Sequence, residues 1–259
     1  MGEWSLFALV FVLGLKHGLD ADHLACIDGL TRYNWNKQRP MARWVGTLFS
    51  LGHGLVVTGV AVIIGLISRM FSFPGYFDQM ATWLSIITLL IIGTLNISNL
   101  VKRTNDQKEF QPQGVKGKWL PKAFRETTNP FVIVMIGGVL ALAADTVSQT
   151  SVWAMAAGNG SKVMPLLLGL TFTIGMVITD TLDSVIIYRS LKSSDKTSQW
   201  ASITMGWMIV LLAYGIGLYE LFLYFNPQAE LELEWLGVAL FMIFFLFFLI
   251  ISWRKKAEA

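Results

Sequence analysis

Two histidines and three aspartates lie in an otherwise apolar stretch between Gly14 and Arg32 that is long enough to cross a bilayer. An ionisable side chain at bilayer depth costs roughly 2.5–3.5 kcal/mol on insertion scales, so such groups usually line an ion pathway or bind an ion. The third histidine of the chain, His53, lies in a second apolar stretch. Imidazole and carboxylate together suit nickel, cobalt or zinc, whereas carboxylate and carbonyl oxygens alone suit magnesium or calcium. These residue types therefore predict a transition-metal site inside the membrane.

The spacing in the first stretch favours one shared ion. On an ideal helix, His17, Asp20 and His23 fall within an arc of about 120° on one face, where two imidazoles and a carboxylate can meet one cation. Asp22 would then point away from Asp20, so either the helix unwinds near Gly18 or Asp22 makes another contact. Irregular backbone at this depth is tolerated only where it is buried or lines a cavity. The alternative is a hydrogen-bond network that joins helices without a metal.

The second stretch, residues 49–57 with the sequence FSLGHGLVV, sets a histidine between two glycines. At about 1.5 Å per residue, His53 lies roughly 14 Å in from Trp44, and His17 lies roughly 20 Å in from Trp4 on the opposite side. In a hydrocarbon core roughly 30 Å thick, the two imidazoles reach a similar depth. We therefore predict that His53 is a ligand of the same ion, although a histidine flanked by glycines also serves as a packing site.

Later apolar stretches carry further polar side chains, in LALAADTVSQTS and GMVITDTLDSVIIYR. They could extend a cation path, form a second binding position or second shell, or make polar contacts between helices, and these interpretations stay open. The candidate residues in these stretches are Asp145, Thr146, Gln149, Asp180 and Asp183, and Asp28 of the first stretch is a candidate for the same roles.

Composition predicts an all-α polytopic membrane protein, because 54% of the 259 residues are hydrophobic. About seven transmembrane helices are expected, at roughly 4–30, 44–69, 80–101, 130–157, 163–189, 200–225 and 234–253. Most lysines and arginines lie in the joining segments 31–43, 102–129, 190–199 and 254–259. The positive-inside rule then puts the N-terminus outside and the C-terminus inside.

Residues 1–259 are expected to form a single transmembrane domain, with 102–129 as a mobile cytoplasmic loop between a three-helix and a four-helix half. The net charge of +3 reflects this uneven distribution and gives no indication of nucleic-acid binding. The expected partners are a divalent metal ion and the lipid bilayer, and a homo-oligomer stays open.

The stretch HGLDADHLACIDGLTR closely resembles the signature of the nickel/cobalt transporter family, and FSLGHGLVV and GMVITDTLDS resemble two later motifs of that family in the expected order. The resemblance implies a secondary permease in the cytoplasmic (inner) membrane of a prokaryote. It would take up nickel or cobalt, with zinc less expected, and it would need no cofactor. The metal-handling positions that the resemblance implies are His17, Asp20, Asp22, His23 and His53.

The chain departs from that family at two points. The family pattern Gly-Phe-Asp-Thr-x-Thr-Glu is replaced here by residues 143–149, AADTVSQ, so Gln149 stands where a carboxylate is typical. Metal selectivity could therefore differ. The signature lies in the first predicted helix instead of the second of eight, which predicts a short form without the usual first helix.

Two other functions stay open at this point. Three histidines with aspartates could hold catalytic zinc in an intramembrane hydrolase. We nevertheless expect this protein not to be an enzyme. The chain could also be the metal-binding subunit of an ATP-driven importer. It contains no Gly-x-x-x-x-Gly-Lys-Ser/Thr segment, so it does not itself hydrolyse ATP by that route. The sequence gives neither the ion nor the direction of transport.

Overall fold

The computed structural model describes residues 3–67, 76–106, 126–142, 163–192 and 195–226, with residues 146, 147, 150, 154, 161, 242, 243 and 246. Its main helices are α1 (Glu3–His17), α2 (Ala21–Asn36), the short 3-10 helix η1 (Pro40–Trp44), α3 (Val45–Ile67), α4 (Tyr76–Asp106), α7 (Pro130–Leu140), α9 (Met164–Leu191) and α10 (Asp195–Phe225). The described part of the chain contains helices and turns and no β-strand, which confirms the all-α prediction.

The first predicted span, 4–30, is wrong as a single helix, because the backbone leaves the helical path between α1 and α2. The amide of Asp20 donates to the carbonyl of His17 at 3.0 Å, a tight i→i−3 turn, and Asp20 itself is extended, with φ −63° and ψ 142°. A β-carbon on Gly18 would collide with the side chain of Thr179 in α9. Glycine thus allows the close approach, and the unwinding considered for this position is confirmed.

Other predicted boundaries are also wrong. Helix α2 continues to Asn36 through the first part of the predicted loop 31–43, and η1 follows it. The second half of α2 is polar, but several of its side chains bond to the helix or to its neighbours. Asn34, for example, donates to the carbonyls of Leu30 and Thr127 at 2.9 and 3.0 Å. Hydropathy alone therefore ends this helix too early.

Helix α7 ends at Leu140, and a turn at 141–142 interrupts the predicted span 130–157. Helix α4 runs past both ends of the predicted span 80–101 and enters the predicted loop 102–129. The central part of that loop, 107–125, and all but three positions of the predicted last span lie outside the described residues.

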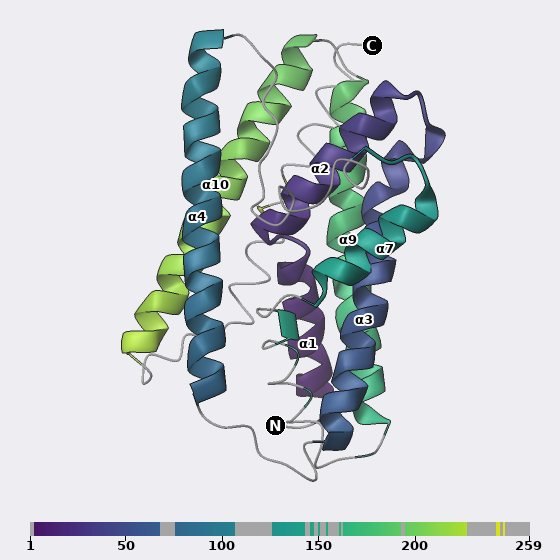
Figure 1. Ribbon diagram of the computed structural model, residues 1–259, viewed down its shortest axis with the longest axis vertical. Helices are drawn as coiled ribbons and strands as arrows, with labels where there is room; N and C mark the ends of the chain where they lie inside the picture. Colours follow the sequence, from purple (N-terminus) through teal and green to yellow (C-terminus); the bar gives the residue numbers. More distant parts are fainter. Residues whose placement is uncertain are drawn as a thin grey trace.

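The helices that carry the site pack around α9. Figure 1 shows α1, α3 and α9 side by side, α7 against α3, and α2 tilted across them, whereas α4 and α10 form a separate pair. Close approach depends on glycine at the α3–α7 crossing, because a β-carbon on Gly52 would collide with the carbonyl of Val134. This crossing fixes the part of α3 that carries His53.

Two apolar core clusters lie on either side of the break in the first span. One cluster includes Val57, Phe172 and Met176, and the other includes Ile27 and Phe49. Phe172 stands against the ring of His17 and Phe49 against the ring of His23. The histidines are therefore held between two packed regions of the fold.

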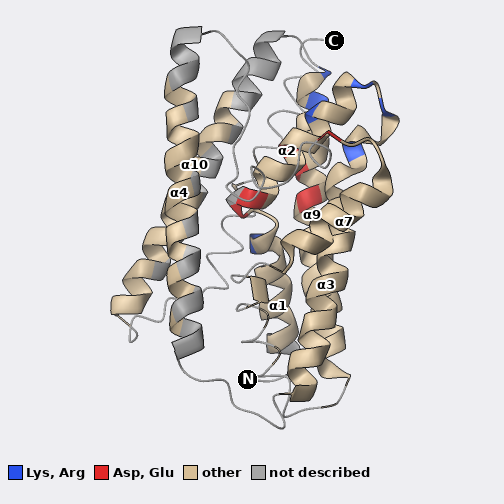
Figure 2. Cartoon of the chain, viewed as in Figure 1, with Lys and Arg blue, Asp and Glu red and all other residues tan. Residues whose placement is uncertain are grey.

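Two described helices, Pro40–Ile67 and Met164–Leu191, are long and apolar enough to cross a membrane. Large apolar side chains cover their outer faces, as in Leu55 of α3, which is 70% exposed. Figure 2 shows lysine and arginine gathered at the end of the bundle that holds η1 and the end of α2, with acidic residues nearer the middle. This charge distribution is the one that the positive-inside rule uses to assign an orientation.

Candidate metal site

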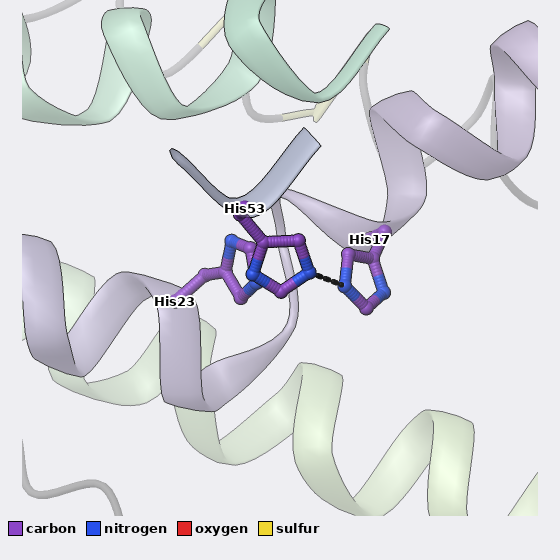
Figure 3. Close-up of side chains that lie close together, drawn as sticks. All are labelled: His17, His23 and His53. Atoms are coloured by element: carbon purple, nitrogen blue, oxygen red, sulfur yellow. Dashed lines mark hydrogen bonds between the residues drawn. The ribbon is translucent and has the colours of Figure 1, made fainter. Parts of the chain in front are cut away.

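The three histidines of the chain converge in the interior. Ring centroids are 4.8 Å apart for His17 and His23, 5.1 Å for His17 and His53, and 4.6 Å for His23 and His53 (Figure 3). One ring nitrogen from each residue can be chosen so that all lie within 4.8 Å of one another. The side chains are 3%, 1% and 1% exposed in sequence order. A buried group of three imidazole nitrogen donors is a typical transition-metal site.

The break in the backbone brings the first two rings together. His17 is the last residue of α1, and His23 lies in the first turn of α2. On a continuous helix these residues would be about 9 Å apart along the axis. Because the chain turns at residues 18–20, both rings face the same point, and α3 adds His53 from the opposite side. The single-helix geometry predicted for this motif is replaced by a three-element arrangement.

The spacing of two ring nitrogens matches that of two ligands on one ion. The Nε2 atoms of His17 and His53 are 3.2 Å apart. Nitrogens at about 2.0–2.1 Å from one metal ion, at tetrahedral or square angles, are about 2.9–3.4 Å apart. The dashed contact in Figure 3 is a hydrogen bond between the rings, and one ion could replace it with little movement of either ring.

Carboxylates hold the other side of two of the rings. Nδ1 of His23 is hydrogen-bonded to Oδ2 of Asp180 at 3.1 Å, and the hydroxyl of Ser50 donates to the same oxygen at 2.6 Å. Nδ1 of His17 lies 3.1 Å from Oδ2 of Asp20, but it makes no hydrogen bond among the described residues. A carboxylate at Nδ1 favours the tautomer whose Nε2 is unprotonated and free to ligate a metal. Nε2 of His23 is buried and has no hydrogen-bond partner among the described residues, which fits this role.

Aromatic side chains form apolar walls around the rings. Phe172 lies 5.3 Å from His17, and Phe49 lies 5.0 Å from His23, each measured between ring centroids. These walls exclude water and limit the positions that the imidazoles can take. A dry site also strengthens the attraction between a cation and the carboxylates behind the rings.

The structure also places three other predicted site residues, all of them aspartates. Asp22 is half-buried in the first turn of α2, and it belongs to no described group of three or more donors. Asp28 is buried and pairs with Arg32, whose Nε lies 2.8 Å from Oδ2. Asp183 is buried in α9, one turn beyond Asp180. The direct contribution of these carboxylates to metal binding stays a prediction.

Thr146 is helical and buried, and its carbonyl accepts a hydrogen bond from the hydroxyl of Thr150 at 2.7 Å. Asp145 and Gln149 lie outside the described residues. The sequence reasoning missed Ser50, which fixes Asp180, and Arg32, which pairs with Asp28. Helical spacing could have identified both residues, because Ser50 precedes His53 by one turn and Arg32 follows Asp28 by one turn.

The chain is similar along most of its length to transport proteins. Nickel transporter NixA of Staphylococcus aureus is 27% identical, over 94% of this chain and 83% of that protein. Nickel transporter NicT of Mycobacterium tuberculosis is 30% identical, over 82% of this chain and 64% of that protein. Cobalt transport protein NhlF of Rhodococcus rhodochrous is 25% identical, over 92% of this chain and 79% of that protein. No solved structure matches this chain significantly.

A protein-family model described as high-affinity nickel-transport protein matches residues 3–254. The match includes the broken first span, the middle of α3 and the whole of α9, which together supply the three histidines and Asp180. The chain therefore belongs to the family of high-affinity nickel-transport proteins.

Proposed function

We propose that this protein is a membrane permease that takes up nickel and/or cobalt ions by secondary transport, and that His17, His23 and His53 bind the ion on its way. The observation that carries the proposal is the convergence of three buried imidazoles, from three separate elements, with carboxylates behind two of the rings. Family membership and the printed functions of the relatives support the same conclusion.

The donor set accounts for the choice of ion. Imidazole nitrogen binds nickel and cobalt far better than magnesium or calcium, which prefer oxygen. Asp20 acts through the ring of His17, and Asp22 adds a negative charge within electrostatic range of His23. These carboxylates attract a divalent cation to a dry site that would otherwise repel it.

The break between α1 and α2 also favours a cation. The last turn of α1 ends at His17, and the C-terminal end of a helix carries partial negative charge. Discontinuous helices whose ends face the substrate are typical of secondary transporters, because irregular backbone at membrane depth is tolerated where it serves a binding site. The interruption of the first span is thus part of the proposed site.

The proposed topology has seven membrane spans, an outside N-terminus and an inside C-terminus, in a prokaryotic inner membrane. It rests on hydropathy and on the basic end of the bundle, which we assign to the cytoplasm (Figure 2). Residues 102–129 would then connect the two halves of one transmembrane domain on the cytoplasmic side.

The membrane potential is sufficient to drive uptake. One charge gains about 2.3 kcal/mol per 100 mV, so a divalent ion gains about 4.6 kcal/mol, or roughly 2,000-fold accumulation at equilibrium. Among the alternatives, a zinc hydrolase would need a pre-formed position for a catalytic water, and family membership favours transport over it. An ATP-driven complex would need a second chain to supply the ATPase.

The deciding experiment measures radiolabelled nickel uptake into cells that express the chain, with unlabelled nickel, cobalt, zinc and manganese as competitors. Purified protein in detergent is titrated with nickel in parallel. We expect His53→Ala to abolish both uptake and stoichiometric binding, whereas Leu55→Ala, on the lipid-facing side of the same helix, should change neither. Unaltered binding and uptake by His53→Ala would refute the site.

A further inference from the structure

Asp183 is a buried carboxyl group that has no hydrogen-bond partner among the described residues. It is 0% exposed, and neither of its carboxylate oxygens accepts a hydrogen bond from any described residue. One turn away on the same helix, Oδ1 of Asp180 is also buried and unsatisfied. A buried carboxylate in this state is costly unless something binds to it during the working cycle.

Other buried oxygens without a hydrogen-bond partner are found further along α2 and α9. They are the hydroxyl of Ser190 in α9 and, in α2, the hydroxyl of Thr31 and the amide oxygen of Asn34. All three residues are at most 3% exposed. Buried oxygen atoms without a partner are uncommon in a packed interface, and a cation or its bound waters could satisfy them.

The interface runs from the histidine cluster to the basic end of the bundle. At one end, His23 of α2 contacts Asp180 of α9 at 3.1 Å. At the other end, the ring centroids of Trp35 and Tyr188 are 5.1 Å apart. Asp183 lies between these two contacts and is within electrostatic range of Asp28 and Arg32 on α2.

A cavity opens where this interface ends. Its volume is about 500 Å³, and Trp35 and Tyr188 both line it. The remaining lining residues are Asn36, Gln38, Arg39 and Pro40, from the end of α2 and the start of η1. An ion that moved from Asp180 past Asp183 would therefore reach a polar mouth at the basic end.

We propose that the metal ion leaves the histidine cluster along the α2–α9 interface and that Asp183 is its next binding position, an oxygen-donor site from which it passes to the cavity at Trp35 and Tyr188. This inference rests on the proposed transport function. The oxygen donors would hold nickel or cobalt more weakly than the imidazoles do, which suits a position that must release the ion.

Arg32 sets the charge of this route. Its Nε donates to both oxygens of Asp28, at 3.0 and 2.8 Å, so the carboxylate of Asp28 is already engaged and the carboxyl group of Asp183 is the one left for a cation. The fixed guanidinium also repels a divalent ion that remains nearby. Asp183 can therefore attract the ion while Arg32 keeps it from being trapped.

The first test uses Asp183→Asn, which keeps the shape and removes the charge. Uptake of nickel is measured at saturating concentration, where affinity no longer limits the rate. We expect the maximal rate to fall by about tenfold or more, while purified protein still binds one nickel ion. The metal-free protein should unfold at about the same temperature, because the carboxyl group that is replaced makes no hydrogen bond among the described residues. Thr171→Val, at a residue of α9 whose hydroxyl bonds only its own helix, is the matched control.

The outcomes separate the route from the transport function. If His53→Ala fails to bind and transport nickel while Asp183→Asn transports at the full rate, the route is wrong and the proposed function stands. If His53→Ala transports normally, the proposed function itself is wrong. If Asp183→Asn lowers the unfolding temperature and loses nickel binding as well as uptake, Asp183 has a structural role and the route is again refuted.

A second test does not depend on transport rates. Ser190→Cys in a Cys26→Ala background is treated with a cationic thiol reagent in inverted vesicles. A side chain that is 3% exposed should react only if the α2–α9 interface opens to water, and nickel should slow the reaction. Ile174→Cys, on the lipid-facing side of α9, is the control and should stay unreactive. An unreactive Ser190→Cys protein would count against this route.

Discussion

Asp180→Asn tests whether a carboxylate prepares His23 for metal binding. Asp180 accepts from Nδ1 of His23 at 3.1 Å, and Ser50 donates to the same oxygen at 2.6 Å. An asparagine at this position can turn its amide toward the ring and donate to Nδ1. The proton would then sit on Nε2, the atom that we assign to the metal, and His23 would no longer ligate in that tautomer.

Loss of a partner of this kind typically weakens metal binding by about 10–100-fold, or about 1.4–2.7 kcal/mol. The assay is calorimetric titration of the purified protein with nickel, with the visible spectrum of bound cobalt as a second readout of the number of nitrogen ligands. We expect weaker nickel binding and a cobalt spectrum with one imidazole fewer.

Two controls distinguish ring orientation from simple charge. Ser50→Ala removes one hydrogen bond to Asp180 but keeps the carboxylate, so it should weaken binding by less than about tenfold. Asp183→Asn removes the same charge one turn away but leaves the contact between Asp180 and His23 intact. Equal losses of affinity in Asp180→Asn and Asp183→Asn would refute the orientation argument and leave only the summed negative charge.

The glycine at the break and the glycine at the α3–α7 crossing should both resist substitution. Gly18→Ala should lower uptake and the unfolding temperature, because its β-carbon would collide with α9, whereas Gly29→Ala, where nothing lies within 4 Å, should be neutral or stabilise by about 0.5–1 kcal/mol. Gly52→Ala should behave like Gly18→Ala, and Gly59→Ala in the same helix should be tolerated; thermal unfolding in detergent checks both pairs. Gln149→Glu is expected to change the competition profile among nickel, cobalt and zinc, and identical profiles before and after would exclude that position from selectivity.

The sequence was sufficient to predict that the three histidines meet, but not how they meet. Counting depth from interfacial tryptophans put His17 and His53 at a similar level, and their rings are in contact in the structure. The histidines and the early aspartates were recognisable because ionisable residues in apolar segments are costly. Their assignment as ligands stays a prediction until a metal titration is made.

The contact between His23 and Asp180 could not be predicted from one sequence, because 157 positions separate the two residues. Asp180 was equally compatible with a pathway or a packing role until α9 was placed beside α2. The break at residues 18–20 depends on the same neighbour, since the side chain of Thr179 occupies the space that a β-carbon on Gly18 would need. Helical periodicity within one segment carries no information about such contacts.

The end of α2 shows why hydropathy misjudged this region. The Asp28–Arg32 pair and the hydrogen bonds of Asn34 allow a polar helix to remain buried. A hydropathy window scores each residue separately, and it therefore predicts a loop at this position. Part of this polarity is satisfied in pairs, which an average over residues does not register. The same polar side chains border the proposed route, and this gives a reason for keeping a costly polar interface inside the bundle.

The two parts of the proposed pathway use different donor atoms in a useful order. The histidine cluster offers nitrogen, which discriminates nickel and cobalt from the more abundant magnesium and calcium. The α2–α9 interface beyond it offers oxygen, which discriminates less and binds these ions less tightly. An ion that has passed the nitrogen site has already been selected, so weaker binding afterwards costs no specificity and speeds release. A route lined by histidine throughout would select equally well but would hold the ion too long at each step.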